Sequence, residues 1–520
     1  MTAQLAFPVL KNYERPDLLC ESGFFIFKNE TINKDKNMAK FNQTVVKSKT
    51  KTTNQAGGQA YKESNELALV SLLLTSFVND QFYRSSDESL SELKKLIKTI
   101  PNKEFIAKSA IFARDEFGMR SITHALAGEL ASEISGKEWG KNFYDKVVSR
   151  VDDMTEIMSY YLSNKTDKNQ PKFPNSLKKG FASAFDKFDE YQLAKYKGEN
   201  KEVKLVDIVN LVHPVPNDRN KIALNALVND NLKNTKTWES MLSQAGQKAQ
   251  SEEELSQLKS EAWVELLSTR KIGYFALLRN LRNIINQAPQ AVPLACDLLV
   301  DENMISKSKV LPFRFATAYE EISKLGTSSD VRKVLVAINK ALDISCCNVP
   351  KFDGDTLVVI DVSGSMGGRP SEIASLFGSM ISKANNCDVM TFANTASYKA
   401  YNPIDSILTI RDSFRFSGGG TNFQDIFIKA NKAYKRIIIL SDTQGWIGYT
   451  TPTKEFNSYK KKFNCEPFVY SWDLAGYSTL QFPEQNVFAL AGFSDKVFDI
   501  MKMMELDKKA LYNKINAIQL

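Results

Sequence analysis

Hydrophobic positions along the chain follow two different patterns, and the change between them falls near residue 350. From about 63 to 342, apolar residues recur every three or four positions, as on one face of an amphipathic helix. After a short linker at 348–354, brief apolar runs alternate with helical patterns. Such alternation predicts parallel strands joined by covering helices. The chain is therefore predicted to fold as a helical region followed by an α/β domain.

The helical region is predicted to form an irregular, HEAT-like array. A single helical pair cannot bury its own apolar face, so successive pairs stack on one another. The predicted helices span 66–78, 87–97, 105–116, 121–133, 139–150, 155–162, 176–196, 205–212, 238–245, 252–269, 274–285, 288–299, 312–324 and 329–344.

The second region is predicted to be a parallel sheet covered on both faces. The expected strands span 356–361, 388–392, 436–441, 467–472 and 487–491. The expected helices span 370–384, 422–434, 452–463, 494–504 and 508–518. The predicted domains are an extension at 1–53, a helical module at 54–350 and an α/β domain at 351–520.

Residues 1–53 contain few side chains that could pack into a core. Their stretch from Lys28 to Lys51 is polar and carries seven lysines. We expect a flexible basic extension, which either contacts nucleic acid or is simply solvated.

Composition narrows the class of protein to which the chain can belong without defining a function. A formal net charge of +8 on 520 residues permits nucleic-acid binding but does not require it. The six cysteines show no CxxC spacing and there are two histidines, which argues against zinc and fits a reducing, cytoplasmic setting. No apolar run is long enough to span a membrane, and no secretory signal is apparent, so we expect no membrane association.

Oxygen-bearing side chains gather where the predicted strands of the α/β domain end. Asp361-Val-Ser363-Gly-Ser365 follows one strand, Asp442 ends another, and Thr421 follows the glycine turn that begins at Ser417. Ligands bind at the carboxyl ends of parallel strands, and hard oxygen donors suit Mg²⁺ or Mn²⁺. A turn without an ion is the alternative. A serine nucleophile is disfavoured, because the domain has no G-x-S-x-G elbow and no histidine. A dinucleotide site is disfavoured, because the glycines do not have the G-x-G-x-x-G spacing.

Basic side chains cluster in two parts of the helical region. The first set comprises Lys178, Lys179, Lys187, Lys195 and Lys197, with His213 after the helix predicted at 205–212. In the second, Arg279 and Arg282 share a helix face, and with Asn280 and Asn283 they are candidates for phosphate contact. The alternative for both sets is a solvated helix face.

The region after residue 350 resembles the von Willebrand factor A domain, because the motifs at Asp361–Ser365, Thr421 and Asp442 occur in the order and with the spacing of that domain. The resemblance implies that the hydroxyls of Ser363, Ser365 and Thr421 bind the metal directly at a metal-ion-dependent adhesion site. It implies that Asp361 and Asp442 act largely through water. The remaining coordination position would take an acidic group from a partner.

Together the two regions resemble the Ro 60 kDa autoantigen family of bacterial or phage type, in which a TROVE module precedes an A domain. The segments that carry the resemblance are Asn54-Gln-Ala-Gly-Gly58, Ala113-Arg-Asp-Glu-Phe-Gly-Met-Arg120, Lys271-Ile-Gly-Tyr-Phe-Ala-Leu-Leu-Arg-Asn-Leu-Arg-Asn-Ile284 and Ser308-Lys-Val-Leu-Pro-Phe-Arg314. It implies a ring of HEAT-like repeats closed by the A domain. It also implies binding of small noncoding Y RNAs and of single-stranded RNA 3′ ends, with an exoribonuclease as a further partner.

At residue level the resemblance matches Lys195, Lys197 and His213 to RNA-contacting positions, with Lys178, Lys179 and Lys187 in the corresponding stretch. The chain departs from the family pattern just after Lys197, where Gly198 and Glu199 replace an expected basic residue. We expect a monomeric, cytoplasmic RNA scaffold without catalytic activity. The alternative is a metal-dependent protein adaptor for which RNA binding is secondary.

Overall fold

The structure of the chain is a computed structural model. It describes residues 24–29, 51–54, 59–62, 65–75, 86–164, 172–198, 201–233, 238–308, 310, 312–346, 349, 351–416, 418–475, 479–481, 487–492, 501–502, 505 and 510–520. The chain divides into two compact units. Unit 1 comprises residues 1–234, 442–445 and 470–520, and unit 2 comprises residues 235–441 and 446–469.

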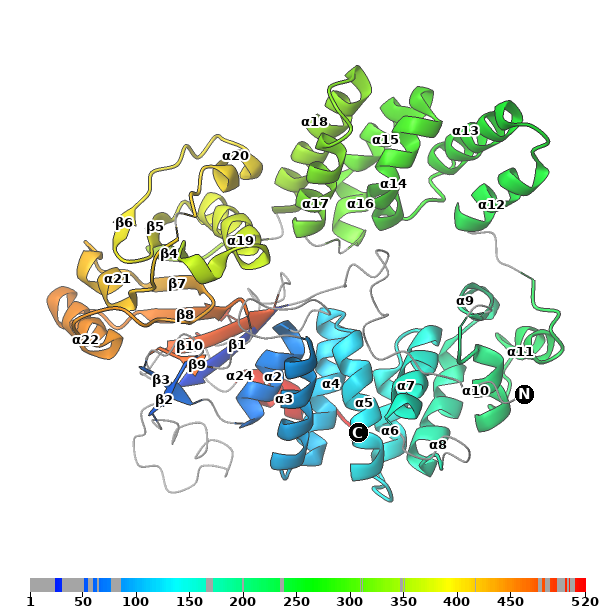
Figure 1. Ribbon diagram of the computed structural model, residues 1–520, viewed down its shortest axis with the longest axis horizontal. Coiled ribbons are helices and arrows are strands. Elements are labelled where there is room, and N and C mark those ends of the chain that lie inside the picture. Colours follow the sequence, from blue (N-terminus) through cyan, green and yellow to red (C-terminus); the bar gives the residue numbers. More distant parts are fainter. Residues whose placement is uncertain are drawn as a thin grey trace, which may run out of the picture. The chain divides into compact units, whose positions relative to one another are not determined.

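Unit 1 is built mainly from short helices that pack in successive pairs (Figure 1). They are α2 (Asn65–Thr75), α3 (Ser86–Thr99), α4 (Lys103–Phe117), α5 (Ser121–Glu133), α6 (Gly140–Val147), α7 (Val151–Ser163), α8 (Asn175–Ala184), α9 (Glu190–Lys195), α10 (Leu205–Val212) and α11 (Lys221–Val228). The side chain of Asn102 accepts a hydrogen bond from the Phe105 N–H and so fixes the start of α4. Gly118, with a φ of 64°, ends that helix in the left-handed conformation.

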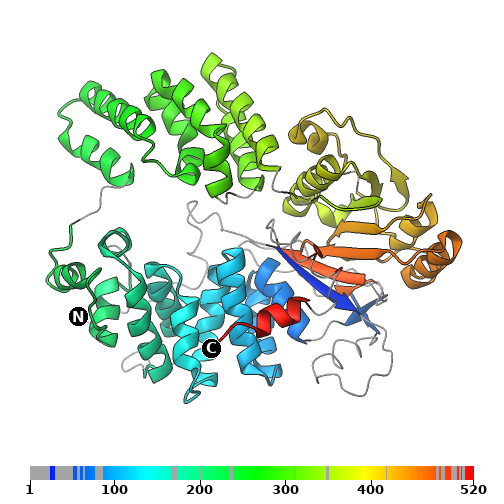
Figure 2. The same ribbon diagram turned by 180° about the vertical axis from the view of Figure 1, so that it is seen from behind.

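Segments distant in the sequence complete unit 1. Strand β1 (Phe24–Asn29) pairs antiparallel with β10 (Val487–Gly492). A small antiparallel sheet joins β2 (Lys51–Thr53), β3 (Gln59–Lys62) and β9 (Thr479–Leu480). The C-terminal helix α24 (Ala510–Asn516), red in Figure 2, packs against α4.

Unit 2 begins with a second helical stack. Its helices are α12 (Trp238–Lys248), α13 (Glu252–Ser268), α14 (Tyr274–Gln287), α15 (Val292–Leu299), α16 (Glu302–Ser308), α17 (Pro312–Ser323) and α18 (Ser329–Ser345). Trp263 is fully buried, and its indole N–H donates to Gln287 at 2.9 Å, tying α13 to α14. Among the described helices, none carries the run of apolar residues that a bilayer crossing needs.

The remainder of unit 2 is an α/β domain. Strand β4 (Thr356–Asp361) lies between the parallel strands β7 (Arg436–Ser441) and β5 (Asp388–Phe392), and β6 (Ala396–Tyr398) pairs antiparallel with β5. Strand β8 (Phe468–Asp473) starts beside β7 in unit 2 and continues into unit 1. The helices are α19 (Arg369–Asn385), α20 (Ile407–Asp412), α21 (Phe423–Lys429) and α22 (Pro452–Phe463). Every residue of β4 and β7 is buried, as expected for central parallel strands.

The predicted fold class, a helical-repeat region with an A-type α/β domain, is confirmed. The prediction of one helix over 176–196 is wrong, because the chain turns after α8 and restarts at α9. A short 3-10 turn and the extended backbone of Phe188 separate the two helices, and both Phe185 and Phe188 are buried at the turn. Asp189 then caps α9 by accepting the Gln192 N–H at 2.9 Å.

The structure also contains elements that the pattern did not predict. Helices α11, α16 and α20 are missing from the predicted set, and β6 and β9 are short edge strands. The expected flexible extension at 1–53 contains strand β1, which pairs with β10, and strand β2, which pairs with β3. The rest of this extension lies outside the described residues. Most of the helix predicted at 494–504, the segment 55–58 and Ser417 also lie outside them.

Candidate functional site

The basic residues predicted on α8 lie on its outer side. Gly180, the next residue, faces α6 so closely that a Cβ there would collide with Tyr144 and the Lys141 carbonyl. This approach fixes which side of α8 is buried, and leaves Lys178 half-buried and Lys179 exposed. Neither lysine forms an ion pair with another described residue.

Two of the predicted lysines are held by contacts within unit 1. The Lys187 ammonium lies 3.2 Å from an Asp145 carboxylate oxygen and donates to the Val148 carbonyl at 2.7 Å. The Lys197 ammonium donates to the Leu232 carbonyl at 3.1 Å. Lys187 thus ties the turn after α8 to the end of α6, and Lys197 ties the segment after α9 to the segment after α11, so both lysines have structural roles.

Lys195 and His213 are exposed at the ends of their helices. Lys195 is the last residue of α9, and its ammonium lies 5.8 Å and 5.5 Å from the ring centroids of Tyr191 and Tyr196. His213 ends α10 in the left-handed conformation, with a φ of 47°. Exposed cationic or ring nitrogens therefore occur on α8, on α9 and directly after α10.

The two predicted arginines belong to α14 and hence to unit 2. Arg279 and Arg282 are both exposed, and the Arg279 guanidinium lies 5.7 Å from the Phe275 ring centroid. The asparagine between them was expected to reach phosphate, and that expectation is wrong. Asn280 is buried, and its amide donates to the Ala276 carbonyl of the preceding turn at 2.8 Å.

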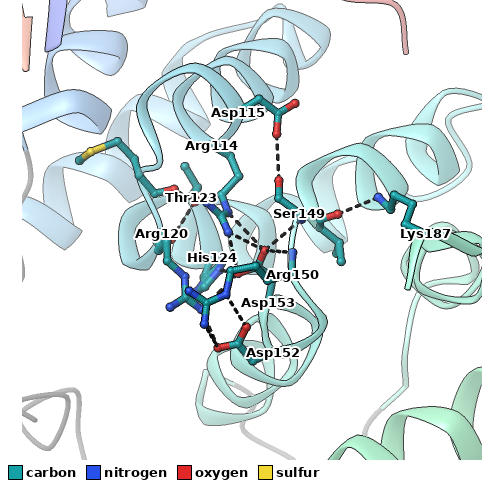
Figure 3. A network of polar contacts seen from close by, with 12 residues as sticks. Arg114, Asp115, Arg120, Thr123, His124, Ser149, Arg150, Asp152, Asp153 and Lys187 are labelled. Atoms are coloured by element: carbon teal, nitrogen blue, oxygen red, sulfur yellow. Dashed lines mark hydrogen bonds and ion pairs between the residues drawn. The ribbon is translucent and has the colours of Figure 1, made fainter. Parts of the chain in front are cut away.

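A buried carboxylate, Asp153 at the start of α7, collects three cationic or ring donors (Figure 3). Arg114 and His124 each approach it to 2.9 Å, and Arg120 to 3.3 Å. Burial alone would raise the pKa of Asp153. The hydrogen bond from His124 and the positive charges around the carboxylate outweigh burial and hold that pKa far below its usual range.

Asp152 extends this network toward solvent. Arg120 donates to it at 2.9 Å and Arg150 at 3.1 Å. Burial again opposes ionisation, and the two guanidiniums overcome it, so the pKa of Asp152 is also lowered. The residue pattern did not indicate this network, although Arg114 and Arg120 lie in a segment that carries the family resemblance.

In the α/β domain, the motif after β4 folds into a hydrogen-bonded turn. Asp361 accepts the Ser363 N–H at 2.9 Å and the Ser441 hydroxyl at 2.6 Å, so both its carboxylate oxygens are oriented. The hydroxyl oxygens of Ser363 and Ser365 lie 3.4 Å apart. The Gly364 N–H donates to the Gly419 carbonyl at 3.0 Å, which joins this turn to the glycine loop before Thr421.

These residues have a donor set that fits a hard cation. Neighbouring ligands of an octahedral Mg²⁺, each about 2.1 Å from the ion, lie about 3.0 Å apart, close to the separation of the two serine hydroxyls. Thr421 is buried beside the glycine loop. The fifth predicted residue, Asp442, directly follows β7 and belongs to unit 1 by its contacts, with its Oδ1 accepting the Gln444 N–H at 3.2 Å. Among the described residues, no three His, Cys, Asp or Glu side chains gather as a metal site.

Two surface aromatic residues beside these sites were not singled out from the sequence. Tyr191 is exposed on α9 next to Lys195. Trp446 is also exposed, and its backbone N–H donates to the Thr421 carbonyl at 3.1 Å. The available signal was an aromatic residue four positions from a lysine, or a tryptophan in a loop that follows a strand.

Stacked helix pairs and a parallel sheet with Asp361-x-Ser363-x-Ser365 at a strand end define a helical-repeat protein with an A-type α/β domain. The TROVE domain family matches residues 74–253 and 230–362, which together make up more than half of the chain. The chain therefore belongs to the TROVE domain family.

A solved structure shares this fold. The crystal structure of the Deinococcus radiodurans Ro (RSR) protein aligns with a TM-score of 0.57 and 15% sequence identity. The alignment covers 85% of this chain and all of that protein. At this identity the likeness concerns the fold alone.

Two curated relatives are both described as telomerase protein component 1. The Mus musculus protein is 22% identical over 341 residues, and the Rattus norvegicus protein is 21% identical over 339 residues. Each alignment covers 51% of this chain but 13% of the relative. The chain thus spans a small part of the length of these relatives.

Proposed function

We propose that this chain is an RNA-binding protein that holds small Y-like noncoding RNA and the 3′ ends of misfolded or structured RNA. In this role it would serve as a scaffold in RNA quality control or decay, with an exoribonuclease as a further class of partner. Membership of the TROVE domain family supports RNA as the ligand. The observation that carries the proposal is the exposure of Lys179, Lys195 and His213 on or directly after the successive helices α8, α9 and α10 of unit 1.

Lysine side chains on this surface bind RNA through phosphate. Each neutralised phosphate releases condensed counterions, so the affinity falls steeply with added salt. Contacts to phosphate position the nucleic acid without reading its sequence. A protein of this kind selects its RNA by shape and by single-stranded character.

Binding of the full chain to a hairpin RNA with a single-stranded 3′ tail, measured at several salt concentrations, tests this proposal. Replacing Lys178 and Lys179 by glutamine should weaken binding and reduce the slope of log K against log[salt] by about 1.4, about 0.7 for each phosphate that is no longer neutralised. The matched control replaces Lys454 and Lys461, two lysines exposed on α22, and should leave the slope unchanged. If the wild-type chain does not bind this RNA at moderate salt, the proposal fails.

We further propose that the chain binds RNA without cleaving it. The exposed basic groups described on or directly after α8, α9 and α10 are lysines and one histidine, side chains suited to neutralising phosphate. A time course with end-labelled RNA and Mg²⁺ should show no turnover. Multiple cleavage events per protein molecule would overturn this part of the proposal.

A second candidate function rests on the α/β domain. We propose that Ser363, Ser365 and Thr421 would hold Mg²⁺ or Mn²⁺, with Asp361 and Asp442 contributing through water. The bound ion would offer a coordination position to a carboxylate of a protein partner. The observation that favours this function is the 3.4 Å separation of the two serine hydroxyls beside the oriented Asp361 carboxylate.

Thermal unfolding in increasing Mg²⁺ tests the metal site, because an ion that binds only the folded chain raises Tm with concentration. The Ser365→Ala variant should lose most of this rise. The control variant Ser371→Ala should keep this rise, because the wild-type Ser371 hydroxyl donates to the Gly368 carbonyl and is not one of the proposed metal ligands. An equal rise in all three proteins would contradict a site at Ser365.

A further inference from the structure

The surface of α9 combines two aromatic rings with two cations. Tyr191 is 47% exposed, and Tyr196 is half-buried just after the helix end. The Lys195 ammonium lies within 6 Å of both ring centroids, at 5.8 Å and 5.5 Å. The Arg150 guanidinium lies 4.6 Å from the centroid of Tyr196. Each distance is within the range of a cation–π interaction.

Local structure fixes this arrangement. Asp189 and Gln192 form a capping box that sets the first turn of α9. Leu193 and Ala194 are buried, so Tyr191 and Lys195, four residues apart on the helix, share the outer face. The helix therefore presents an aromatic ring and a cation side by side.

Arg150 reaches the same surface from the start of α7. Two hydrogen bonds to Asp152, both at 3.1 Å, hold its guanidinium. The cation over Tyr196 is therefore positioned by the polar network of Figure 3 rather than by α9 itself. Two separate elements thus contribute positive charge to one aromatic surface.

We propose that Tyr191 and Tyr196 form a stacking site for unpaired bases of RNA, with Lys195 neutralising the adjoining phosphate. This inference rests on the proposed function and specifies that α9 binds single-stranded RNA. Exposed aromatic faces beside cations bind single-stranded nucleic acid, since every base has a face that can stack. In a duplex those faces are already covered by neighbouring base pairs, so paired RNA gains nothing from Tyr191.

The test compares a single-stranded oligoadenylate RNA with a blunt RNA duplex of the same length, both titrated with the full chain. Tyr191→Leu removes the ring and keeps an apolar side chain. It should raise the Kd for the single strand about tenfold, within the range of effects seen when one stacked base loses its aromatic partner. The Kd for the duplex should stay within about twofold. Tyr191→Phe should restore tight single-strand binding, because the ring suffices for stacking.

Two further readouts separate stacking from charge. Tyr191→Leu should leave the salt slope unchanged, whereas Lys195→Gln should lower it by about 0.7, the value for one phosphate contact to a single strand. A 2-aminopurine base in the strand should be quenched on binding by the wild-type chain and less so by Tyr191→Leu. The control Tyr449→Leu removes a fully exposed tyrosine of unit 2 and should behave as the wild type.

The outcomes distinguish this inference from the proposed function. If the wild-type chain binds neither of these RNAs nor the tailed hairpin, the proposed function fails. If it binds the hairpin but not the single strand, the stacking site alone is overturned. If it binds both and Tyr191→Leu matches it on the single strand, the stacking site alone is overturned. Equal weakening of single-strand and duplex binding by Tyr191→Leu would also overturn it, because Tyr191 would then act through the fold of α9.

Discussion

The carboxylate of Asp153 gives a structural role to two residues that carry the family resemblance. Arg114 and Arg120 belong to the segment Ala113–Arg120, and in the structure both donate to Asp153, together with His124. Arg114 and Asp153 are almost completely buried. These arginines therefore hold α4, α5 and α7 together. The resemblance at this segment therefore includes residues that stabilise the helical stack.

Replacing Asp153 by asparagine should destabilise unit 1 strongly. The variant leaves the Arg114 guanidinium buried without its anionic partner, which typically costs about 3–5 kcal/mol of unfolding free energy. Urea unfolding followed by circular dichroism measures this loss. Glu92→Gln is the matched control, since it breaks the exposed pair with Lys95 and should cost less than about 1 kcal/mol. Equal losses in the two variants would contradict the assignment.

The same carboxylate predicts how stability depends on pH. Because the pKa of Asp153 is lowered on folding, its contribution is complete above the unfolded value of about 3.9 and is lost as the pH falls below it. The wild-type unfolding free energy should therefore decline in acid below about pH 4. Asp153→Asn should show a shallower decline, with the remainder partly due to Asp152, whose pKa is also lowered. Parallel pH profiles would refute this account.

At the scale of elements, the sequence predicted those features that depend on local pattern. Strands β4, β5 and β7 and helices α5, α10 and α22 have the predicted bounds, because runs of apolar residues with strand or helix periodicity define them. The break between α8 and α9 was missed. The apolar spacing runs on through Phe185 and Phe188, and only the tertiary burial of both rings makes the chain turn there. The Asp189-x-x-Gln192 capping box was the available signal.

Removing that cap should weaken α9 selectively. Asp189→Ala deletes the acceptor for the Gln192 N–H and should cost about 1 kcal/mol. Amide hydrogen exchange should quicken at Gln192 and along α9, while exchange within α4 stays as in the wild type. The control Asp186→Ala alters an exposed neighbour in the 3-10 turn and should leave exchange in α9 unchanged. Uniform acceleration across unit 1 would indicate a wider role for Asp189.

At the scale of the whole molecule, the change from helical to α/β pattern was predictable, whereas the composition of the compact units was not. Unit 1 unites the first 234 residues with residues 470–520, through pairings such as β1 with β10. No local pattern links segments so far apart in sequence. The candidate metal residues were found because their motifs adjoin recognisable strands. Tyr191 was missed because its one signal, a tyrosine four residues before a lysine, does not distinguish a binding surface from an ordinary solvated helix face.

The discontinuity of unit 1 has a consequence for synthesis on the ribosome. Helix α4 packs against α24, where Phe105 stacks on Tyr512 at 6.4 Å and the Lys108 ammonium donates to the Asn516 carbonyl. Between the end of α4 at Phe117 and the start of α24 at Ala510 the ribosome adds 392 residues, which takes about 20–78 s at about 5–20 residues per second. For that interval the apolar surface of α4 awaits its partner helix. The nascent chain is then a natural client for a chaperone that shields apolar surface until translation ends.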